Sequence, residues 1–306
     1  MKPIRIAIIG FGKIAADQHV PSIAGNPRFE LVASSSRSGE GVAQTFTDWR
    51  EMLRTMEGLD AVAITTPPSV RHEIARECIL AGLHVLLEKP PAATLSEIDD
   101  LSCLAEAEGT TLFATWHSRH NPSVSAAAQA LAGKRIAEMQ VVWQEDVHKW
   151  HPGQQWIWEP GGFGVFDPGI NALSIATHIL PGPIVLDDAE LEFPANREAP
   201  IAARLSLRTA AGAPIAMDLD WRQTGPQTWD IQVETDAGPL LLSQGGAVLT
   251  LPSGTSRAED REYPALYARF AELIQSRSSE VDTDPLRLVT DAFLRGKAIP
   301  IEPFYD

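Results

Sequence analysis

Residues Ile4-Arg5-Ile6-Ala7-Ile8-Ile9-Gly10-Phe11-Gly12-Lys13-Ile14-Ala15 decide the fold of this chain. An apolar run, typical of a buried strand, ends in a turn that fits the pattern G-x-G-x-x-G/A at the start of a helix. In such a turn the first glycine permits the tight bend, the second lets the backbone approach a pyrophosphate, and the third small residue packs against the strand. The phosphates then lie over the helix N-terminus. The stretch predicts a dinucleotide site made by Gly10, Gly12, Lys13, Ile14 and Ala15.

The N-terminal part of the chain alternates short apolar runs with stretches of helical spacing. The predicted strands are Ile4–Ile9, Phe29–Ser34, Ala61–Thr65, His84–Leu87 and Thr111–Ala114. The predicted helices are Lys13–Ala24, Asp48–Thr55, Val70–Ala81 and Leu95–Glu108. We expect Ser69 to cap the third helix, and Thr94 with Glu97 to form a capping box on the fourth. This alternation predicts an α/β domain with a doubly wound parallel sheet of the Rossmann type.

A different pattern begins near residue 120, where Asn121-Pro122 is typical of a helix start. Segments of alternating apolar and polar residues follow, and they indicate an open antiparallel sheet with one face toward a core. These segments are Ala137–Asp146, Ala202–Thr209, Pro214–Arg222, Thr228–Thr235 and Pro239–Ser243. The prediction is a dinucleotide-binding domain over residues 1–119 and a substrate-binding α+β domain over residues 120–306. Whether the C-terminal helices pack back on the first domain stays open, and the open sheet face is a candidate surface for a homo-oligomer.

The composition argues against several classes of protein. Of 306 residues, 25 are Lys or Arg and 40 are Asp or Glu, so the formal net charge is −15. This charge repels phosphate backbones and anionic lipids, which argues against nucleic-acid and membrane partners. The two cysteines, Cys78 and Cys103, have no CxxC partner, and no compact metal-ligand spacing is present, so we expect neither a disulfide framework nor a metal. Because the N-terminus lacks a signal-like segment, the expected location is the cytoplasm.

The end of the second predicted strand bears on which dinucleotide binds. NAD-binding proteins usually place Asp or Glu there for the ribose hydroxyls, whereas this chain has Ser36 and Arg37, with Glu40 as its first acid. A hydroxyl and a guanidinium suit a 2′-phosphate, which a carboxylate would repel. We therefore expect NADP as the cofactor. The alternatives are that Arg37 is a solvated loop charge and NAD binds, or that NAD serves as a second cofactor.

Glu88-Lys89-Pro90 follows the fourth predicted strand, at the carboxyl edge where open α/β sheets bind ligands. A lysine at this edge would reach a substrate hydroxyl beside the nicotinamide, and the alternative is an ordinary surface charge. His117 follows the fifth predicted strand at the same edge. It is a candidate either for a substrate ligand or for a structural histidine.

Four stretches together resemble the Gfo/Idh/MocA oxidoreductase family: the glycine-rich turn at 10–15, Thr66-Pro67-Pro68, Glu88-Lys89-Pro90 and the segment from Gly161 to Asn171. The resemblance covers nearly the whole chain and implies a Rossmann domain, a nicotinamide cofactor and oxidoreductase activity. It implies cofactor contacts from Thr66, Pro67, Glu88 and Lys89. The family pattern has a histidine four residues after an aspartate. Here Asp167 is followed by Asn171, so the imidazole often assigned as the base is absent from that position.

A narrower resemblance is to the bacterial aldose 1-dehydrogenases of this family, which act on L-arabinose and D-galactose. It rests on the stretches 115–119, 143–147, 150–162 and 167–171. These enzymes also have asparagine at the position of Asn171. The resemblance implies oxidation of an aldose at its anomeric carbon, C1.

The residues themselves also indicate a sugar ligand. Four tryptophans, Trp143, Trp150, Trp156 and Trp158, are interleaved with carboxylates, imidazoles and amides. An aromatic ring covers the C–H face of a sugar while polar side chains bind its hydroxyls, although most tryptophans pack in a core. We expect one or two of the four at the ligand. The candidate substrate-binding residues are His117, Glu145, Trp150, His151, Asp167, Asn171 and, on a later strand, Trp229.

The predicted reaction moves a hydride from C1 to the nicotinamide while a protein base takes the hydroxyl proton. The candidate catalytic residues are Asp167 as the base, Lys89 as a hydrogen-bond donor to the same hydroxyl, and Asn171, which would hold the sugar or the carboxylate. Lys89 as the base is an alternative. Two other functions stay open: oxidation of another sugar or a cyclic polyol at a ring carbon, and an NADP-binding sensor without turnover. Glu88-Lys89-Pro90 together with Asp167 argues against a sensor, which needs neither group.

Overall fold

The run Ile4–Ile9 forms β1, which lies near the middle of a six-stranded parallel sheet in the computed structural model, where residues 2–305 are described. The strand order is β3-β2-β1-β4-β5-β6, so the predicted doubly wound Rossmann-type sheet is confirmed. The other strands are β2 (Phe29–Ser35), β3 (Gln44–Phe46), β4 (Ala61–Ile64), β5 (His84–Leu87) and β6 (Leu112–Ala114).

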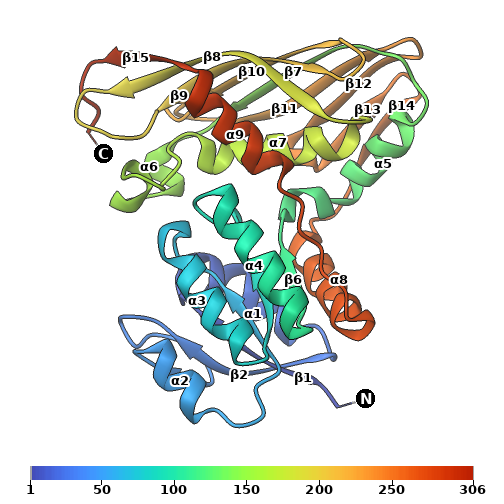
Figure 1. The fold of residues 1–306 in the computed structure, drawn as a ribbon. Coiled ribbons are helices and arrows are strands. Elements are labelled where there is room, and N and C mark those ends of the chain that lie inside the picture. The colour runs from blue at the N-terminus through green and yellow to red at the C-terminus, as the bar shows by residue number, and fades with distance from the viewer. Residues whose placement is uncertain (1, 306) are drawn as a thin grey trace. The chain divides into compact units, whose positions relative to one another are not determined.

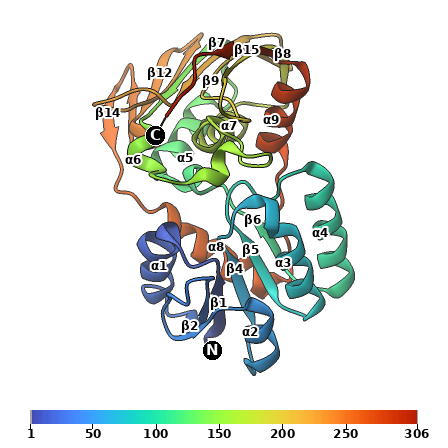
Figure 2. The ribbon, with the colours of Figure 1, turned by 90° about the vertical axis from the view of Figure 1, so that its left-hand side faces the viewer.

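Helices cover both faces of this sheet, as Figure 2 shows. Ala7 and Ile9 of β1 pack in one core with α2, α3 and α4, whereas Ile6 and Ile8 pack in a second core with α1 and α8. Alternate side chains of one strand thus enter opposite cores, which is why the strand is apolar throughout. The helices of this unit are α1 (Val20–Ala24), preceded by a π-helical turn η1 (Ala15–His19), α2 (Trp49–Thr55), α3 (Pro68–Leu80), α4 (Leu95–Glu108) and α8 (Glu262–Ser276).

The helix caps agree with the sequence in one predicted case and differ in another. Thr94 accepts a hydrogen bond from the Glu97 backbone N–H, and the Glu97 side chain accepts from the Thr94 N–H, so the predicted capping box is confirmed. The prediction that Ser69 caps α3 is wrong. Helix α3 begins at Pro68 and its N-cap position is Pro67, because a proline at the first helical position needs no N–H partner.

The second sheet has nine strands in the order β14-β13-β12-β11-β7-β10-β9-β8-β15. The predicted open sheet is present, and six of its eight pairings are antiparallel as expected. It is a mixed sheet, however, because β10 pairs with β7 in parallel, and β15 pairs with β8 in parallel. In each case a long connection containing a helix returns the chain in the same direction. The strands are β7 (Ile136–Gln144), β8 (Ile184–Pro194), β9 (Ala202–Thr209), β10 (Pro214–Asp220), β11 (Thr228–Thr235), β12 (Gly238–Ser243), β13 (Val248–Leu251), β14 (Gly254–Arg257) and β15 (Lys297–Ile301).

Helices α5, α7 and α9 lie along one face of the nine-stranded sheet (Figure 1). In β9, Leu205 and Leu207 are buried while Arg204, Ser206 and Arg208 are exposed, so the opposite face carries polar side chains. The sheet is therefore one-sided, as the alternation predicts. The helices are α5 (Pro122–Leu131), α6 (Val147–Trp150), α7 (Phe166–Ile179) and α9 (Asp284–Arg295), and the short turns are η2 (His117–His120), η3 (Gln155–Trp158) and η4 (Gln244–Gly246).

The chain divides into two compact units, Met1–His117 with Glu262–Thr283, and Ser118–Arg261 with Asp284–Asp306. This division differs from a single boundary between residues 119 and 120. Tyr267 and Phe270 of α8 are fully buried in the core of the six-stranded sheet, so α8 belongs to the first unit although it follows most of the second. Helix α9 belongs to the second unit, where it packs on α7 and β8.

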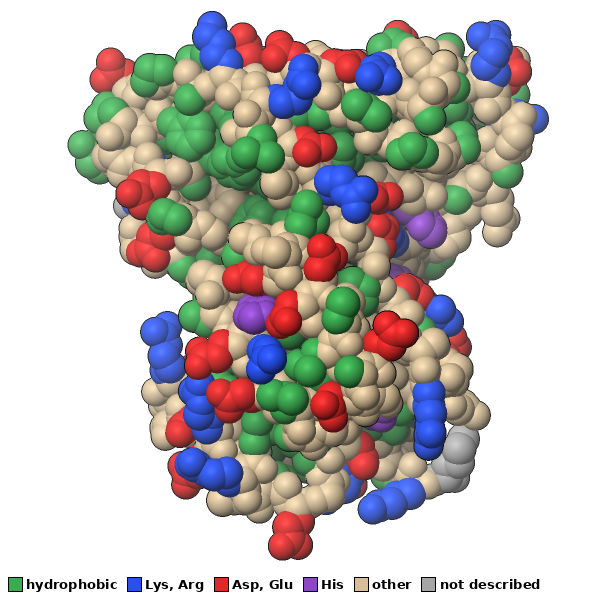
Figure 3. Space-filling model, viewed as in Figure 1, with side chains coloured by type: hydrophobic (Ala, Val, Ile, Leu, Met, Phe, Trp, Pro, Cys, Tyr) green, Lys and Arg blue, Asp and Glu red, His purple; other side chains and the backbone are tan. Residues whose placement is uncertain are grey.

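Acidic and basic side chains are interspersed over the face of the molecule in Figure 3. Among residues 2–305, no helix combines the length and the apolar composition that a membrane span requires.

Candidate active site

The glycine-rich turn after β1 has the geometry of a dinucleotide site. Gly10 has φ +99°, and a Cβ on it would lie 2.6 Å from the Thr66 backbone nitrogen, so only glycine fits there. A Cβ on Gly12 would have a single neighbour, the Gly10 carbonyl oxygen at 4.0 Å, so open space lies above this position. Ala15 is fully buried against the sheet. The turn thus leaves room for a pyrophosphate and packs its third small residue as predicted.

Four of the predicted cofactor-binding residues lie at this turn or at the end of β2, and Lys13, Ile14 and Arg37 are exposed while Ser36 is half-buried. Lys13 forms an ion pair with Asp17 one helical turn later, and Ile14 is partly exposed. At the end of β2, the Ser36 hydroxyl donates to the Glu40 carbonyl at 2.7 Å, and Arg37 is exposed. The Arg37 guanidinium is therefore accessible to an anionic group, whereas the Ser36 hydroxyl is already engaged in a hydrogen bond within its loop.

The buried Arg71 ties together the two loops that carry the other predicted cofactor contacts. Its guanidinium donates to the carbonyl of Thr66 after β4, and to the carbonyls of Glu88 and Pro90 after β5. The Thr66 hydroxyl is buried and has no hydrogen-bond partner among residues 2–305. A buried polar group in this condition points to a missing partner, and a bound nucleotide at the carboxyl edge would supply one.

Glu88 is the centre of a buried hydrogen-bond network. Its carboxylate accepts from the Tyr263 hydroxyl at 2.6 Å and from the Lys89 backbone N–H at 2.6 Å. His19 lies with Nε2 3.3 Å from the same carboxylate and with Nδ1 2.8 Å from the Tyr267 hydroxyl. Burial alone would raise the pKa of Glu88, but the hydrogen bond and charge of His19, the charge of His117 and the Tyr263 hydroxyl together lower it. Glu88 is thus an ionised carboxylate that fixes the backbone immediately before Lys89.

His117 belongs to the same region of the first unit. Its Nδ1 lies 2.6 Å from Glu262 Oε2, and its ring stacks on Tyr263 with centroids 5.3 Å apart. Burial favours the neutral ring, but the hydrogen bond and charge of Glu262, with the charge of Glu88, raise the pKa of His117, and the charge of Lys89 opposes them. The positive charges of Lys89 and His117 therefore interact. Glu262 holds the His117 ring in place, whether or not a ligand contacts it.

In the second unit, Glu145 lies at the end of β7 and is buried. Its two oxygens accept hydrogen bonds from indole N–H groups, Trp221 at 3.3 Å and Trp229 at 3.0 Å. Burial raises the pKa of Glu145 and the charge of Asp167 adds to this, while the charge of His151 and the two indoles oppose it. Glu145 is therefore a carboxylate held rigidly on two sides.

Asp167 lies in the first turn of α7 and is buried. Its Oδ2 is 3.3 Å from Nε2 of His151, which follows α6. Asn171 is partly exposed four residues along the same helix. The predicted substrate residues Glu145, His151 and Asp167 are thus neighbours, although Asp167 is distant from the other two in the sequence.

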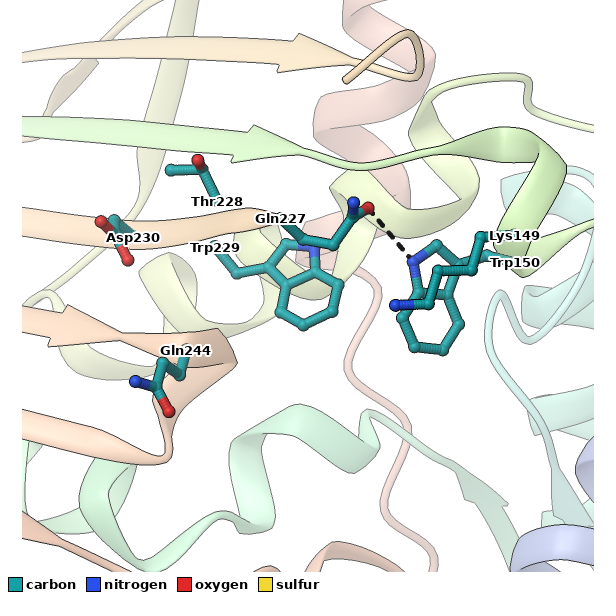
Figure 4. A pocket seen from close by; sticks show the side chains of 7 residues that line it. All are labelled: Lys149, Trp150, Gln227, Thr228, Trp229, Asp230 and Gln244. Atoms are coloured by element: carbon teal, nitrogen blue, oxygen red, sulfur yellow. Dashed lines mark hydrogen bonds between the residues drawn. The ribbon is translucent and has the colours of Figure 1, made fainter. Parts of the chain in front are cut away.

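A pocket of about 380 Å³ in the second unit contains two of the predicted aromatic residues (Figure 4). The rings of Trp150 and Trp229 have centroids 5.7 Å apart, and the Trp150 indole N–H donates to Gln227 at 3.3 Å. Lys149 lies over the Trp150 ring at 4.9 Å. The remaining lining residues are Thr228, Asp230 and Gln244. Two aromatic rings among amides and charges suit a polyhydroxylated ligand.

The other tryptophans have packing roles. Trp143 and Trp158 are 5% and 3% exposed, and Trp156 is partly buried, so Trp150 is the most exposed of the four. Sequence reasoning missed Trp221, Gln227, His19, Arg71, Tyr263 and Tyr267. The stretch around Tyr263 and Tyr267 is an aromatic helix start with no chemical motif, so it gives no signal of a role.

The predicted site residues fall into two groups. Lys89, Glu88, His117 and the glycine-rich turn belong to the first unit, and Glu145, His151, Asp167 and Asn171 belong to the second. Among residues 2–305, no cluster of His, Cys, Asp or Glu side chains has the arrangement of a metal site.

Known proteins resemble this chain over its length. The oxidoreductase family with an NAD-binding Rossmann fold, Gfo/Idh/MocA, matches residues 4–116. Galactose 1-dehydrogenase of Pseudomonas fluorescens is 41% identical over 309 residues, covering 100% of both chains. The crystal structure of a D-galactose-1-dehydrogenase protein from Rhizobium etli has a TM-score of 0.95 and 53% identity, covering 100% of this chain and 99% of that one.

More distant structures share only the fold. A 3-ketoreductase from Actinomadura kijaniata, solved with NADP and TDP-benzene, has a TM-score of 0.85 at 20% identity and covers 98% of this chain and 100% of its own.

The fold and the turn after β1 define a nicotinamide-nucleotide oxidoreductase, and the prediction that the protein is an enzyme is confirmed. The chain belongs to the Gfo/Idh/MocA family, and its predicted resemblance to bacterial galactose 1-dehydrogenases is confirmed.

Proposed function

We propose that this protein oxidises the C1 hydroxyl of an aldopyranose, D-galactose, L-arabinose or both, to the aldonolactone. One observation carries the proposal. A buried aspartate, Asp167, is paired with His151 beside Glu145, in a chain that is 41% identical to a galactose 1-dehydrogenase over its whole length. This group offers carboxylates and an imidazole to sugar hydroxyls, and the Trp150 and Trp229 rings offer aromatic surface nearby.

Each catalytic candidate has a role in this proposal. Asp167 accepts the proton of the C1 hydroxyl, Lys89 donates a hydrogen bond to the same oxygen as negative charge develops there, and Asn171 holds the sugar by its amide. The bound nicotinamide would accept the hydride from C1. The alternative base is Lys89 itself. His117 and Glu145 would bind other hydroxyls of the ring.

The nucleotide site fits NADP or NAD. Gly10, Gly12, Lys13, Ile14 and Ala15 would hold the pyrophosphate, with Thr66, Pro67, Glu88 and Lys89 toward the nicotinamide. We propose NADP as the preferred cofactor, because Arg37 is exposed at the end of β2 and no carboxylate precedes Glu40 there. Removing both side chains, Ser36→Ala with Arg37→Ala, is expected to raise KM for NADP far more than KM for NAD. Equal increases for both nucleotides would contradict the preference.

The function is tested by following nucleotide reduction with D-galactose, L-arabinose, D-xylose and D-glucose. Asp167→Asn is expected to lower kcat by about 10²–10⁴-fold with nucleotide affinity retained, since general-base catalysis contributes this much. Turnover close to the wild-type value would remove Asp167 from the catalytic role. The product separates C1 oxidation from oxidation of a ring carbon or a cyclic polyol, because a lactone hydrolyses to an acid and a ketone does not. Nucleotide binding with no turnover on any substrate would indicate a sensor.

Two further parts of the proposal concern the protein's setting. The polar, one-sided face of the nine-stranded sheet is proposed as the surface of a homo-oligomer, to be tested by sedimentation. Both cysteines are free thiols, which fits a reducing compartment, so a cytoplasmic location stays part of the proposal.

A further inference from the structure

His151 and Asp167 come from separate segments and meet as a nearly buried pair. His151 follows the four-residue helix α6, and Asp167 lies in the first turn of α7. His151 Nε2 is 3.3 Å from Asp167 Oδ2, and the two side chains are 15% and 6% exposed. The family pattern expects an imidazole at position 171, which is asparagine here. In this chain the imidazole next to Asp167 therefore comes from His151, on another segment.

The neighbours of His151 determine where its protons lie. The Trp156 indole N–H donates to Gln154 at 3.1 Å, and an indole is a donor only, so the Gln154 atom facing it is the carbonyl oxygen. The same oxygen lies 3.3 Å from Nδ1 of His151. Because an amide oxygen only accepts, Nδ1 carries a hydrogen and donates it to Gln154. The Nδ1 proton is thus fixed by contacts away from Asp167.

With the hydrogen of a neutral His151 ring on Nδ1, the Nε2 and Asp167 Oδ2 atoms that face each other are both hydrogen-bond acceptors, unless one more proton is present. In a neutral ring with hydrogen on Nδ1, Nε2 has a lone pair, and an ionised carboxylate also has only lone pairs. At 3.3 Å the two would repel each other in a site shielded from water. A single proton between Nε2 and Oδ2 removes the repulsion, and it lies on Nε2, because an imidazole is more basic than a carboxylate.

The other groups around the pair favour retention of this proton. The charge of the buried Glu145 acts on both His151 and Asp167, and it is the third titratable group of the cluster. The Trp221 ring packs on His151 with centroids 5.2 Å apart and excludes water from it. With Asp167 and Glu145 both acidic, a proton shared within the cluster lowers its negative charge.

We propose that His151 is the positioning residue of Asp167, and that the pair holds one shared proton which it must lose before Asp167 can accept the proton of the substrate. His151 thereby supplies the imidazole that is missing at position 171, where this chain has asparagine. In the reaction the substrate O–H bond breaks and its proton passes to Asp167, while the C1 hydride leaves with its electron pair for the nicotinamide. The loss of the shared proton before catalysis rests on the proposed function, whereas the presence of that proton between His151 and Asp167 does not.

The shared proton is tested first by ¹⁵N NMR of the His151 ring in the full-length protein, without sugar. We expect both ring nitrogens to be protonated near neutral pH in the wild type. In Asp167→Asn the titration midpoint of His151 is expected to move to lower pH, because the acidic partner is lost. Identical titrations in the two proteins would overturn the inference. This result does not depend on turnover, so it stands or fails apart from the proposed function.

The kinetic test changes Gln154 and leaves the pair itself intact. Gln154→Glu stabilises the doubly protonated ring, so the rising limb of kcat against pH is expected to move to higher pH. Gln154→Leu removes the acceptor and is expected to move the limb to lower pH. Gln155→Glu is the matched control: it adds the same charge at the next, exposed residue, whose side chain contacts Arg197, and is expected to leave the limb unchanged.

Two outcomes separate the inference from a structural role of this segment. A pH limb that stays in place in both Gln154 variants, with only KM altered, would show that His151 merely supports the loop. Absence of nucleotide reduction with every aldose would overturn the proposed function, and the NMR titration would still decide whether the pair shares a proton.

Discussion

The Tyr263 hydroxyl donates a hydrogen bond of 2.6 Å to the Glu88 carboxylate across 175 residues of sequence. The same carboxylate accepts from the Lys89 backbone N–H, so helix α8 holds the chain directly before the lysine proposed to contact the substrate. His19 joins this carboxylate to the turn that follows the glycine-rich stretch. Three segments of the first unit are thus connected through one buried negative charge.

Tyr263→Phe tests this connection by removing one hydroxyl while keeping the ring that stacks on His117. We expect a loss of about 1.5–3 kcal/mol in the free energy of unfolding, because the hydrogen bond ends on a charged group. We also expect a lower kcat, since Lys89 is held less firmly. Urea unfolding and steady-state kinetics measure the two effects. Tyr267→Phe, whose hydroxyl meets His19 instead, is the control, and a larger loss there would contradict the assignment.

The ion pair between His117 and Glu262 makes stability depend on pH. The pKa of His117 is raised in the folded protein, so its contribution is complete below the ordinary histidine value and is lost as pH rises through the folded value. We expect Glu262→Gln to destabilise the protein by about 1–3 kcal/mol near pH 6 and by less near pH 9. Denaturant unfolding at both values measures the difference. A cost that grows with pH would reverse the assigned sign.

Gly10 and Gly12 are expected to respond differently to the same substitution. Gly10→Ala forces a Cβ to within 2.6 Å of the Thr66 backbone at a positive φ, so we expect it to destabilise the fold by at least about 1–3 kcal/mol. Gly12→Ala meets open space, so the fold is retained, but the methyl group occupies the place of the pyrophosphate. Thermal unfolding and calorimetric titration with NADP separate the effects. Tight nucleotide binding by Gly12→Ala would contradict the proposed site.

Trp150 and Trp158 distinguish a ligand contact from a packing role. Trp150 is 38% exposed in the pocket, and we expect Trp150→Ala to raise KM for the sugar while stability changes little. Trp158 is 3% exposed, and Trp158→Ala is expected to lower the free energy of unfolding by about 3–5 kcal/mol. Kinetics and urea unfolding of both variants measure this contrast. An unchanged KM in Trp150→Ala would remove that ring from the sugar site.

The local patterns of the sequence predicted five of the six strands of the first sheet. Ile4–Ile9 and His84–Leu87 form strands with the predicted bounds, because each is a buried apolar run between polar turns. Strand β3 was not predicted, since Gln44–Phe46 is a short, exposed edge strand without an apolar run. The direction of β10 relative to β7 was not predicted either, because alternation shows which face is buried and says nothing of which strand lies beside it.

The sequence predicted site residues only where a polar side chain lies within a motif or a stretch that resembles the family. Glu145, His151 and Asp167 were selected from sequence, and the second unit places them together. Tyr263, Tyr267 and Arg71 were not, because their roles depend on hydrogen bonds to segments distant in the chain. A tyrosine at the start of an amphipathic helix looks the same in sequence whether its hydroxyl meets water or a buried carboxylate.

The interrupted course of the first unit has a consequence for synthesis. Translation completes the strands of the six-stranded sheet by Ala114, yet the Tyr263 and Tyr267 hydroxyls that contact Glu88 and His19 emerge only with α8, after the whole stretch Ser118–Arg261. A nascent chain stalled before Glu262 therefore lacks the Tyr263 hydrogen bond to Glu88 and the apolar side chains that α8 packs on the sheet. On the ribosome, the nucleotide-binding half is begun first, yet it is expected to become protease-resistant only once Glu262–Thr283 have emerged, shortly before Asp284–Asp306 complete the second unit.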